Sequence, residues 1–302
     1  MTVVSVRDLS RHFGDTAAVE SLSFDVERGQ LFGVVGPDGA GKTTLLRMLT
    51  GVLPPTSGDA LVQGVSVARE PERVKPFVAY MSQRFGLYQD LTVRENILFY
   101  ADLYRVPRRE LPARMARLYQ FSRLEEFEHR RAGQLSGGMK QKLSLSCALV
   151  HQPDVLLLDE PTFGVDPISR RDLWLILHQM VVEGTTVIVT TSYLDEAERC
   201  DRVALLHEGR LLALDAPAAI QQRLHGRLLE VRGPDPRQLR DALRALPAVA
   251  RATLFGDAVH VIPSGTLTPG ELETALGAPG ATVLPAQSSL EDAFIDLVGE
   301  LS

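Results

Sequence analysis

A glycine-rich segment containing one lysine and two threonines gives the clearest indication of chemistry in this sequence. From Gly36 to Thr43 it fits the pattern G-x-x-x-x-G-K-[ST], with an apolar run before it (31–35) and a helical run after it (44–49). Glycine allows the backbone to turn several N–H groups toward one face, and the following helix presents the positive end of its dipole there. The segment therefore predicts a phosphate-binding loop whose default ligand is a nucleoside triphosphate.

Within this loop, the Lys42 ammonium would reach the β- and γ-phosphates, and the Thr43 hydroxyl would ligate Mg²⁺. The alternative is a glycine-rich turn that happens to precede a helix, but strand, loop and helix are all in register, which favours phosphate binding. The predicted nucleotide-binding residues are Gly36, Pro37, Asp38, Gly39, Ala40, Gly41, Lys42, Thr43 and Thr44.

Two carboxylates follow an apolar run that ends at Leu158, namely Asp159 and Glu160. The run is typical of a fully buried parallel strand, and ligands of open α/β sheets bind at the carboxyl ends of the strands. Asp159 suits the Mg²⁺ shell beside Thr43, and Glu160 suits a base that activates or orients water in phosphoryl transfer. Two acids that merely start a helix are the alternative, which the preceding apolar run disfavours.

Three further positions each allow a functional and a purely structural interpretation. Gln83, at the end of an expected strand (78–83), could coordinate Mg²⁺ or hold a water, or be an ordinary turn residue. Phe13 could stack on a purine ring or lie in the core under a hairpin. Ser136, with two glycines after it, begins a helix that runs through Leu149; it could bind an anion or simply cap that helix.

The composition is that of an ordinary globular protein, with 302 residues, 45% hydrophobic and 23% charged, enough for one large and one smaller domain. A formal net charge of −6 argues against a broad nucleic-acid surface. We expect no membrane span, no secretory signal and a location on the cytosolic side. Cys147 and Cys200 suggest neither a disulfide framework nor a zinc site; both should be buried, and any metal should arrive with the nucleotide.

The remaining large-domain elements follow from periodicity and turn residues. Thr92 and Glu95 form a capping-box pattern that opens a mainly helical block reaching about residue 128, interrupted near Pro107 and Pro112. The other expected strands are 3–6, 22–26, a pair within 60–67, 185–191, 202–206 and 211–214, and a further helix is 168–183.

In their order along the chain, these segments resemble an ATP-binding cassette (ABC) ATPase over about residues 1–222. The resemblance implies an α/β P-loop NTPase fold, with a RecA-like core, an antiparallel β subdomain and a helical subdomain at about residues 85–150. The segment that resembles the family signature comprises Leu135, Ser136, Gly137, Gly138 and Gln141.

The resemblance also implies how such a chain would work. The phosphate loop of one cassette and the signature Ser136 and Gly138 of another would enclose one MgATP, so the chain should act as a homodimer or with a different second cassette. Phe13 would stack on adenine, Asp166 would couple the two halves, and Glu160 would activate water. Hydrolysis of ATP would then separate the halves.

Within the family, the sequence is similar to ATPase subunits of bacterial multidrug-type exporters. The stretches 83–88, 91–96 and 193–200 carry this similarity. It implies a separate membrane permease that supplies the translocation path and holds the chain at the cytoplasmic face of the inner membrane. The loop near Gln83 and the helical subdomain would contact that permease.

The pattern of residues 223–302 predicts a small α+β accessory domain, for which a ferredoxin-like arrangement is one option. We expect this domain to have a dimerising or regulatory role. The expected strands are 227–232, 249–254, 258–262 and 282–285, and the expected helices are 236–246, 269–276 and 290–301.

Two residues depart from the family pattern. Ser192 stands where a histidine usually contacts the γ-phosphate and the attacking water, and Asp38 stands where asparagine is common. Serine donates a hydrogen bond but is shorter and does not titrate near neutral pH. Either Glu160 and Mg²⁺ still carry hydrolysis, which we favour, or the chain is a hydrolysis-impaired regulatory cassette beside an active one. A soluble, non-transport ABC ATPase acting on nucleic acid is disfavoured by the acidic charge and the single cassette, so no nucleic-acid partner is expected.

Overall fold

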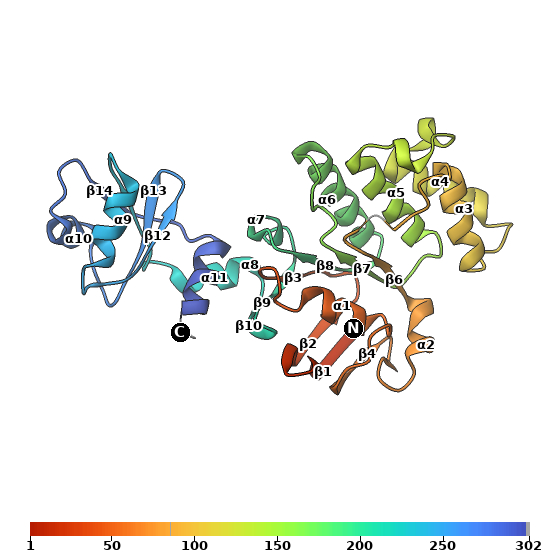
Figure 1. Cartoon of the computed structure of the whole chain (residues 1–302), viewed down its shortest axis with the longest axis horizontal. Coiled ribbons are helices and arrows are strands. Elements are labelled where there is room, and N and C mark those ends of the chain that lie inside the picture. The colour runs from red at the N-terminus through yellow and green to blue at the C-terminus, as the bar shows by residue number, and fades with distance from the viewer. Residues whose placement is uncertain (85, 300–302) are drawn as a thin grey trace. The chain divides into compact units, whose positions relative to one another are not determined.

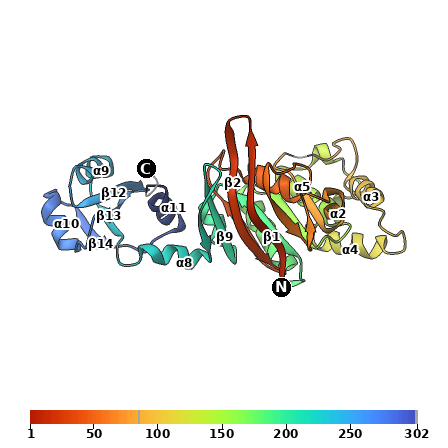
Figure 2. The same ribbon diagram turned by 90° about the horizontal axis from the view of Figure 1, so that it is seen from below.

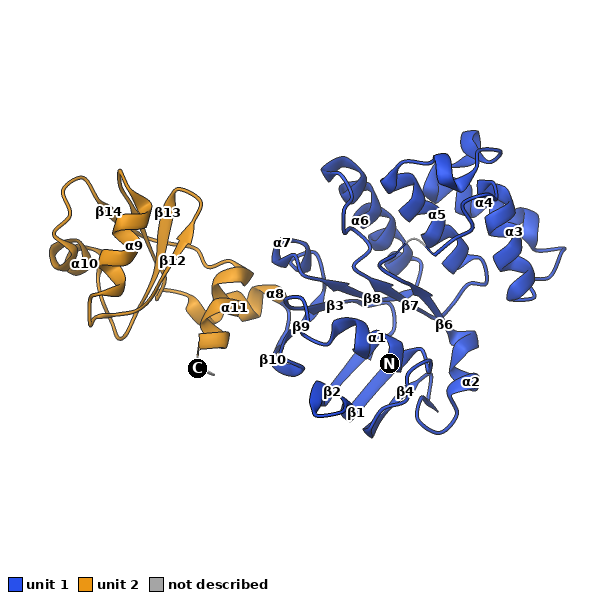
Figure 3. Cartoon of the chain, viewed as in Figure 1, with its two compact units in different colours: residues 1–216 blue, residues 217–302 orange. Residues whose placement is uncertain are grey.

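The computed structural model describes residues 1–84 and 86–299. Its contacts divide the chain into two compact units, Met1–Ala216 and Pro217–Ser302 (Figure 3). The domain change at residue 222, inferred from sequence, stays a prediction. Phe85 of the stretch 83–88 and Leu301, the expected end of the last helix, lie outside the described residues.

A six-stranded sheet forms the centre of the first unit, in the order β10-β9-β3-β8-β7-β6. Its strands are β3 (Leu31–Val35), β6 (Val78–Met81), β7 (Val155–Asp159), β8 (Thr186–Thr191), β9 (Arg202–His207) and β10 (Arg210–Asp215). All neighbours are parallel except β10 and β9. Every residue of β3, β7 and β8 is buried. Because the three strands are parallel, their carboxyl ends meet at one edge of the sheet, where the candidate residues follow.

A second, antiparallel sheet has the order β2-β1-β4-β5. Its strands are β1 (Thr2–Phe13), β2 (Thr16–Glu27), β4 (Ser57–Val62) and β5 (Val65–Ser66). β1 and β2 form a long hairpin, visible in Figure 2, and are far longer than the strands 3–6 and 22–26 expected from sequence. Helix α1 (Lys42–Leu49) lies between the two sheets (Figure 1), and its leucines complete the core that both sheets share.

The helical part of the first unit has a core of its own, built from α3 (Val93–Leu103), α4 (Leu111–Ser122) and α5 (Gly137–Leu149). The capping box at Thr92 and Glu95 is confirmed, since both reciprocal hydrogen bonds are present. The helical block is interrupted between α3 and α4, near Pro107 and Pro112, as expected. Pro112 itself lies in the first turn of α4, where proline is tolerated. The unit also contains α2 (Pro71–Val74), α6 (Pro167–Val182), α7 (Leu194–Ala197) and the 3₁₀ turns η1 (Lys75–Phe77), η2 (Glu125–Phe127) and η3 (Ala132–Gln134).

The second unit contains an antiparallel sheet in the order β12-β13-β11-β14. Its elements are α8 (Pro217–Gln221), η4 (Gln222–Leu224), β11 (Leu229–Arg232), α9 (Pro236–Arg244), β12 (Val249–Phe255), β13 (Ala258–Pro263), α10 (Pro269–Leu276), β14 (Thr282–Pro285) and α11 (Leu290–Gly299). From β11 to β14 the connectivity is β-α-β-β-α-β, the ferredoxin-like order anticipated from the sequence. The small α+β domain is therefore confirmed.

Cys147 and Cys200 are both buried and unpaired with each other. Within the described part of the chain, none of the helices combines the length and the apolar character needed to cross a membrane.

Candidate active site

The phosphate loop follows β3 and requires glycine at two of its positions. A Cβ atom on Gly36 would lie 2.2 Å from the Leu206 carbonyl oxygen, and one on Gly41 would lie 2.3 Å from that of Ala18. Gly41 also has a φ of +95°, a backbone conformation that residues with a side chain rarely adopt. The loop thus passes close to neighbouring backbone and turns directly into α1 at Lys42.

Lys42 points back over the loop and is only 5% exposed. Its Nζ donates hydrogen bonds to the carbonyl oxygens of Gly36 (2.8 Å) and Pro37 (3.0 Å). It also forms an ion pair with Glu160, with 3.1 Å between Nζ and Oε1. A buried ammonium needs such partners, and here one of them is the carboxylate proposed to activate water.

Asp159 is surrounded by three hydroxyl donors. Its Oδ1 accepts from Thr43 Oγ1 (3.0 Å) and Thr190 Oγ1 (2.9 Å), and its Oδ2 accepts from the Tyr80 hydroxyl (3.0 Å). Burial, aided by the charge of Asp159, raises the pKa of Tyr80 to about 12, so this hydroxyl remains a donor at neutral pH. Thr43 and Asp159 therefore place a hydroxyl and a carboxylate oxygen together, which are the hard ligands that Mg²⁺ prefers.

Glu160 is fixed in an unusual conformation at the end of β7. Its φ is +47°, and its N–H donates to Thr190 Oγ1 at 3.0 Å. Gln83 Nε2 donates to Glu160 Oε2 at 2.9 Å. In this structure, Gln83 thus contacts the carboxylate itself, an arrangement that the sequence did not predict.

A cavity of about 560 Å³ brings most of the predicted residues together. Its lining consists of Phe13, Ala18, Asp38, Gly39, Ala40, Gly41, Lys42, Thr43, Thr44, Gln83, Glu160 and Phe163. The Phe13 side chain lines the cavity and is 49% exposed. This exposure agrees with stacking on a purine ring and disagrees with a place in the core. The Arg11 guanidinium lies 4.6 Å from the centre of the Phe13 ring.

Several residues around this cavity were missed by sequence reasoning. Ala18 and Phe163 line it, and Tyr80 and Thr190 hold Asp159. Phe163 follows Glu160 by three positions, and this proximity in the sequence could have pointed to it. In the structure its side chain is 53% exposed. Thr190 and Tyr80 gave none, because threonine and tyrosine are ordinary strand residues.

The signature segment, Asp166 and Ser192 do not line this cavity. Ser136 caps α5, accepting from the N–H of Met139 at 3.3 Å, and a Cβ atom on Gly138 would lie 2.3 Å from Ser169 Oγ. Asp166 caps α6 and accepts from the N–H groups of Ser169 and Ile168, and these bonds, chiefly the one from Ser169, lower its pKa. The signature segment therefore packs against the start of α6, beside Asp166.

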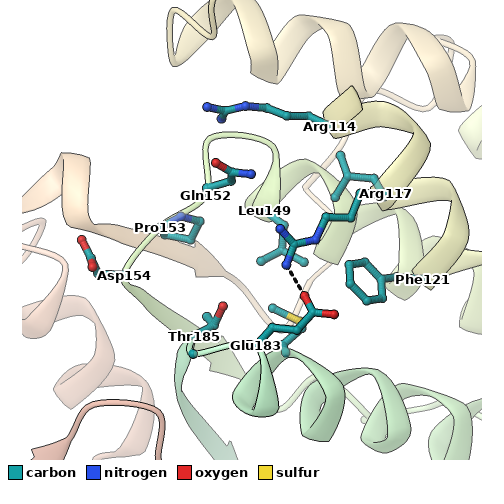
Figure 4. A pocket seen from close by; sticks show the side chains of 12 residues that line it. Arg114, Arg117, Phe121, Leu149, Gln152, Pro153, Asp154, Glu183 and Thr185 are labelled. Carbon is teal, nitrogen blue, oxygen red and sulfur yellow. Dashed lines mark hydrogen bonds and ion pairs between the residues drawn. The ribbon is translucent and has the colours of Figure 1, made fainter. Parts of the chain in front are cut away.

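A second cavity of about 270 Å³ lies between α4, the loop before β7 and the end of α6 (Figure 4). An ion pair between Arg117 and Glu183 crosses it, and Arg114 donates to the Val150 carbonyl oxygen at 2.8 Å. None of the predicted site residues lines this cavity. We assign it no role in nucleotide chemistry.

Comparison with known proteins agrees with this geometry. A family model described as "ABC transporter" matches residues 19–163. The chain is 44% identical over 301 residues to the "Probable multidrug ABC transporter ATP-binding protein YbhF" of Escherichia coli (strain K12), covering 98% of this chain but 52% of that relative. It thus spans about half the length of this relative and of the matching protein of Shigella flexneri.

A full-length match also exists. The chain is 38% identical over 301 residues to the "Nod factor export ATP-binding protein I" of Burkholderia orbicola (strain AU 1054), covering 98% of this chain and 97% of that protein. A solved structure described as the "Structure of ATP binding subunit of ABC transporter" superposes with a TM-score of 0.67 at 30% identity, covering 74% of this chain and 93% of the other. The predicted cassette fold is confirmed, and the chain belongs to the ATP-binding proteins of ABC transporters.

Proposed function

We propose that this chain is the ATP-binding and ATP-hydrolysing subunit of a membrane exporter, with multidrug-type efflux as its transport class. The observation that carries the proposal is the convergence of the phosphate loop with Gln83 and Glu160 in one cavity, where Lys42 Nζ lies 3.1 Å from Glu160 Oε1. The names of the relatives, which refer to multidrug transport and to Nod factor export, support the transport role.

In this proposal the loop N–H groups and Lys42 bind the β- and γ-phosphates of ATP, and Phe13 stacks on adenine. Thr43 and Asp159 are suited to hold Mg²⁺, because their oxygens lie 3.0 Å apart and could turn toward one cation. Mg²⁺ bound there would neutralise charge on the phosphates during transfer.

Glu160 accepts the proton of the water that attacks the γ-phosphorus. In the structure, its two oxygens are engaged by Lys42 and by Gln83. Phosphate oxygens compete for the Lys42 ammonium, so ATP binding frees Glu160 Oε1 to face water. Gln83 then remains as the side chain that orients the carboxylate.

The working assembly contains a second cassette and a permease. Since the signature residues Ser136 and Gly138 do not line the cavity of their own chain, they are available to close the cavity of another copy or of a different cassette. Asp166, beside the signature segment, would couple the two halves. A membrane permease would hold the pair at the cytoplasmic face of the inner membrane.

A regulatory cassette with impaired hydrolysis is the second candidate function, and Ser192 is the observation that favours it. The serine side chain is shorter than that of histidine and does not titrate near neutral pH. Positioning and electrostatics supply most of the catalysis in phosphoryl transfer, and Glu160, Lys42 and Asp159 are all in place, so active hydrolysis remains the proposal.

Steady-state ATP hydrolysis with Mg²⁺ by the full chain tests both candidates. We expect the wild type to turn over and Glu160→Gln to lower kcat by about 100-fold or more, because the proton acceptor is lost while ATP binding is kept. Glu208→Gln, whose side chain is 85% exposed, is the matched control and should keep wild-type turnover.

The variant Ser192→His separates the two candidates. If the wild type is no more active than Glu160→Gln and Ser192→His gains activity, the chain is a regulatory cassette. If none of these proteins hydrolyses ATP, although each binds it, the proposed motor function is wrong.

A further inference from the structure

Glu196 is a buried carboxylate outside the nucleotide cavity. It lies in α7, and the residue is only 1% exposed. Burying a charge is costly unless partners compensate for the lost water. The partners of Glu196 therefore show what the chain gains from placing a carboxylate there.

The two carboxylate oxygens of Glu196 contact three separate segments. Oε2 accepts hydrogen bonds from Thr162 Oγ1 (2.7 Å) and Thr191 Oγ1 (3.1 Å). Oε1 forms an ion pair with Arg170 of α6, at 3.3 Å from its Nε. Both threonines are 1% exposed, so neither hydroxyl has water as an alternative partner.

Each of these segments carries one residue of the proposed site. Thr162 follows Glu160 by two positions, and Thr191 directly precedes Ser192. Arg170 lies in the first turns of α6, which Asp166 caps. Glu196 therefore lies where the backbones leading to Glu160, Ser192 and Asp166 come together.

Two further contacts extend the connection. The Thr191 carbonyl oxygen accepts from the N–H of Gly36 in the phosphate loop at 3.3 Å. The Arg170 guanidinium lies 4.6 Å from the centre of the Tyr193 ring, next to Ser192. A displacement of any one segment would therefore disturb contacts of the others.

We propose that Glu196 is a positioning residue that holds the segments of Glu160, Ser192 and Asp166 in one fixed relative arrangement during ATP hydrolysis. The proposal rests on the proposed function and deepens it. A carboxylate suits this position because one oxygen serves two hydroxyl donors while the other faces a guanidinium. A glutamine side chain has only one acceptor oxygen. If that oxygen accepted from the threonines, the amide N–H would face Arg170. If it faced Arg170, the threonines would lose their acceptor.

The alternative is that Glu196 merely stabilises the fold. Thr162→Val distinguishes the two, because it removes one hydroxyl at almost constant volume and leaves Thr191 and Arg170 with Glu196. Thr186→Val is the matched control. Thr186 is fully buried and lies at the other end of the strand that contains Thr191. Its hydroxyl oxygen accepts a hydrogen bond from the N–H of Gly29 at 3.0 Å.

The first measurement is the kcat of ATP hydrolysis together with the equilibrium dissociation constant for ATP and the melting temperature. We expect Thr162→Val and Glu196→Gln to lower kcat by about 10- to 100-fold, as displaced catalytic groups do, with ATP affinity within about two-fold of wild type. Thr162→Ser, which restores the hydroxyl, should restore kcat. Thr186→Val should lower the melting temperature as much as Thr162→Val does, yet keep kcat.

A second measurement does not depend on turnover. Hydrogen exchange of the full chain followed by mass spectrometry reports the opening of residues 160–166 and 192–197 separately. In Glu196→Gln we expect both segments to exchange faster together, and in Thr186→Val neither to change.

The outcomes separate this proposal from the proposed function. If the wild type does not hydrolyse ATP, the motor function fails, and the exchange data still decide whether Glu196 joins the segments. The positioning role is overturned if hydrogen exchange in Glu196→Gln rises in only one of the two segments. It is also overturned if the wild type is active but the kcat values of Glu196→Gln and Thr162→Val fall no further than that of Thr186→Val.

Discussion

Glu160 combines two unfavourable features at one residue, a left-handed backbone and a buried charge. Its φ of +47° is rare for a residue with a side chain and costs on the order of 1 kcal/mol. The hydrogen bond from its N–H to Thr190 Oγ1 and the ion pair with Lys42 hold it in place. Such strain is found where surrounding structure fixes a side chain for function, which agrees with the proposed role of Glu160.

Phe13 provides a prediction at the same scale. If its exposed ring stacks on adenine, Phe13→Ala should weaken ATP binding about 2- to 10-fold, since an aromatic contact is worth about 1 kcal/mol. Equilibrium titration with a fluorescent ATP analogue measures this. Phe99→Ala, which removes a 40% exposed ring from α3, is the control and should bind like wild type. Equal affinity of Phe13→Ala and wild type would contradict stacking.

Single residues were predictable from sequence where their type was unusual for their position. Glycines before Lys42 and two acids after an apolar strand have few structural reasons to occur, so their chemistry was visible. The roles of Thr190 and Tyr80 depend on strand register instead, since Asp159 pairs with Thr190 across β7 and β8. Register between strands far apart in sequence is set by the whole core, and no local pattern reveals it.

At the scale of elements, the buried strands and capped helices were predicted well, and the β1–β2 hairpin was not. Its register shifts between Val6 and Leu9 and again between Leu9 and Arg11, and Asp8 and Ser21 have positive φ values. Such bulges break the alternation of apolar and polar residues that identifies a strand. The sequence therefore predicted only the regular ends of two long strands.

Helix α11 gives a pH-dependent prediction, because it meets the sheet of its unit through His260. The imidazole Nδ1 lies 2.7 Å from Asp292 Oδ1 of α11, and Nε2 lies 3.7 Å from Glu230 Oε2. Arg232 Nε contacts the other oxygen of that carboxylate, Oε1. Phe255 stacks on the ring at 4.3 Å. The hydrogen bond with Asp292 raises the pKa of His260 despite its burial.

A raised pKa in the folded state means that protonated His260 stabilises folding. The contribution is complete below the unfolded-state pKa of about 6.5 and is lost as pH rises through the folded-state value. In calorimetry of the full chain, the stability advantage of wild type over His260→Gln should therefore shrink as pH rises from about 6 upward. An advantage that grows with pH would contradict the assignment.

The Asp292 carboxylate limits the same contact at acid pH. Burial alone would raise its pKa, but hydrogen bonds from His260 and Ser289 outweigh burial, and the pKa of Asp292 is lowered. Its contribution is present above the unfolded-state value of about 4 and is lost as pH falls through the folded-state value. The attachment of α11 is therefore expected to be strongest between these two limits.

At the scale of the whole molecule, the two segments predicted from the sequence to bind anions do not meet. The phosphate loop lines the nucleotide cavity, whereas Ser136 and Gly138 pack beside the start of α6 and do not line it. A helix N-terminus such as that of α5 needs an anion or caps for its free N–H groups. The simplest arrangement that uses both is a head-to-tail pair of cassettes in which each chain completes the site of the other.

A mixing experiment tests whether two copies of this chain share their sites. Lys42→Ala removes the phosphate-binding ammonium; Gly137→Asp places an acid at an exposed helix start, where it suits the helix dipole but repels phosphate. Each variant alone should be inactive. An equimolar mixture should recover up to about a quarter of wild-type turnover, since half of randomly formed dimers are mixed and one of their two sites is intact. If both variants are folded and the mixture stays inactive while the wild type turns over, two copies of this chain do not complete each other's sites, and the head-to-tail pairing is contradicted.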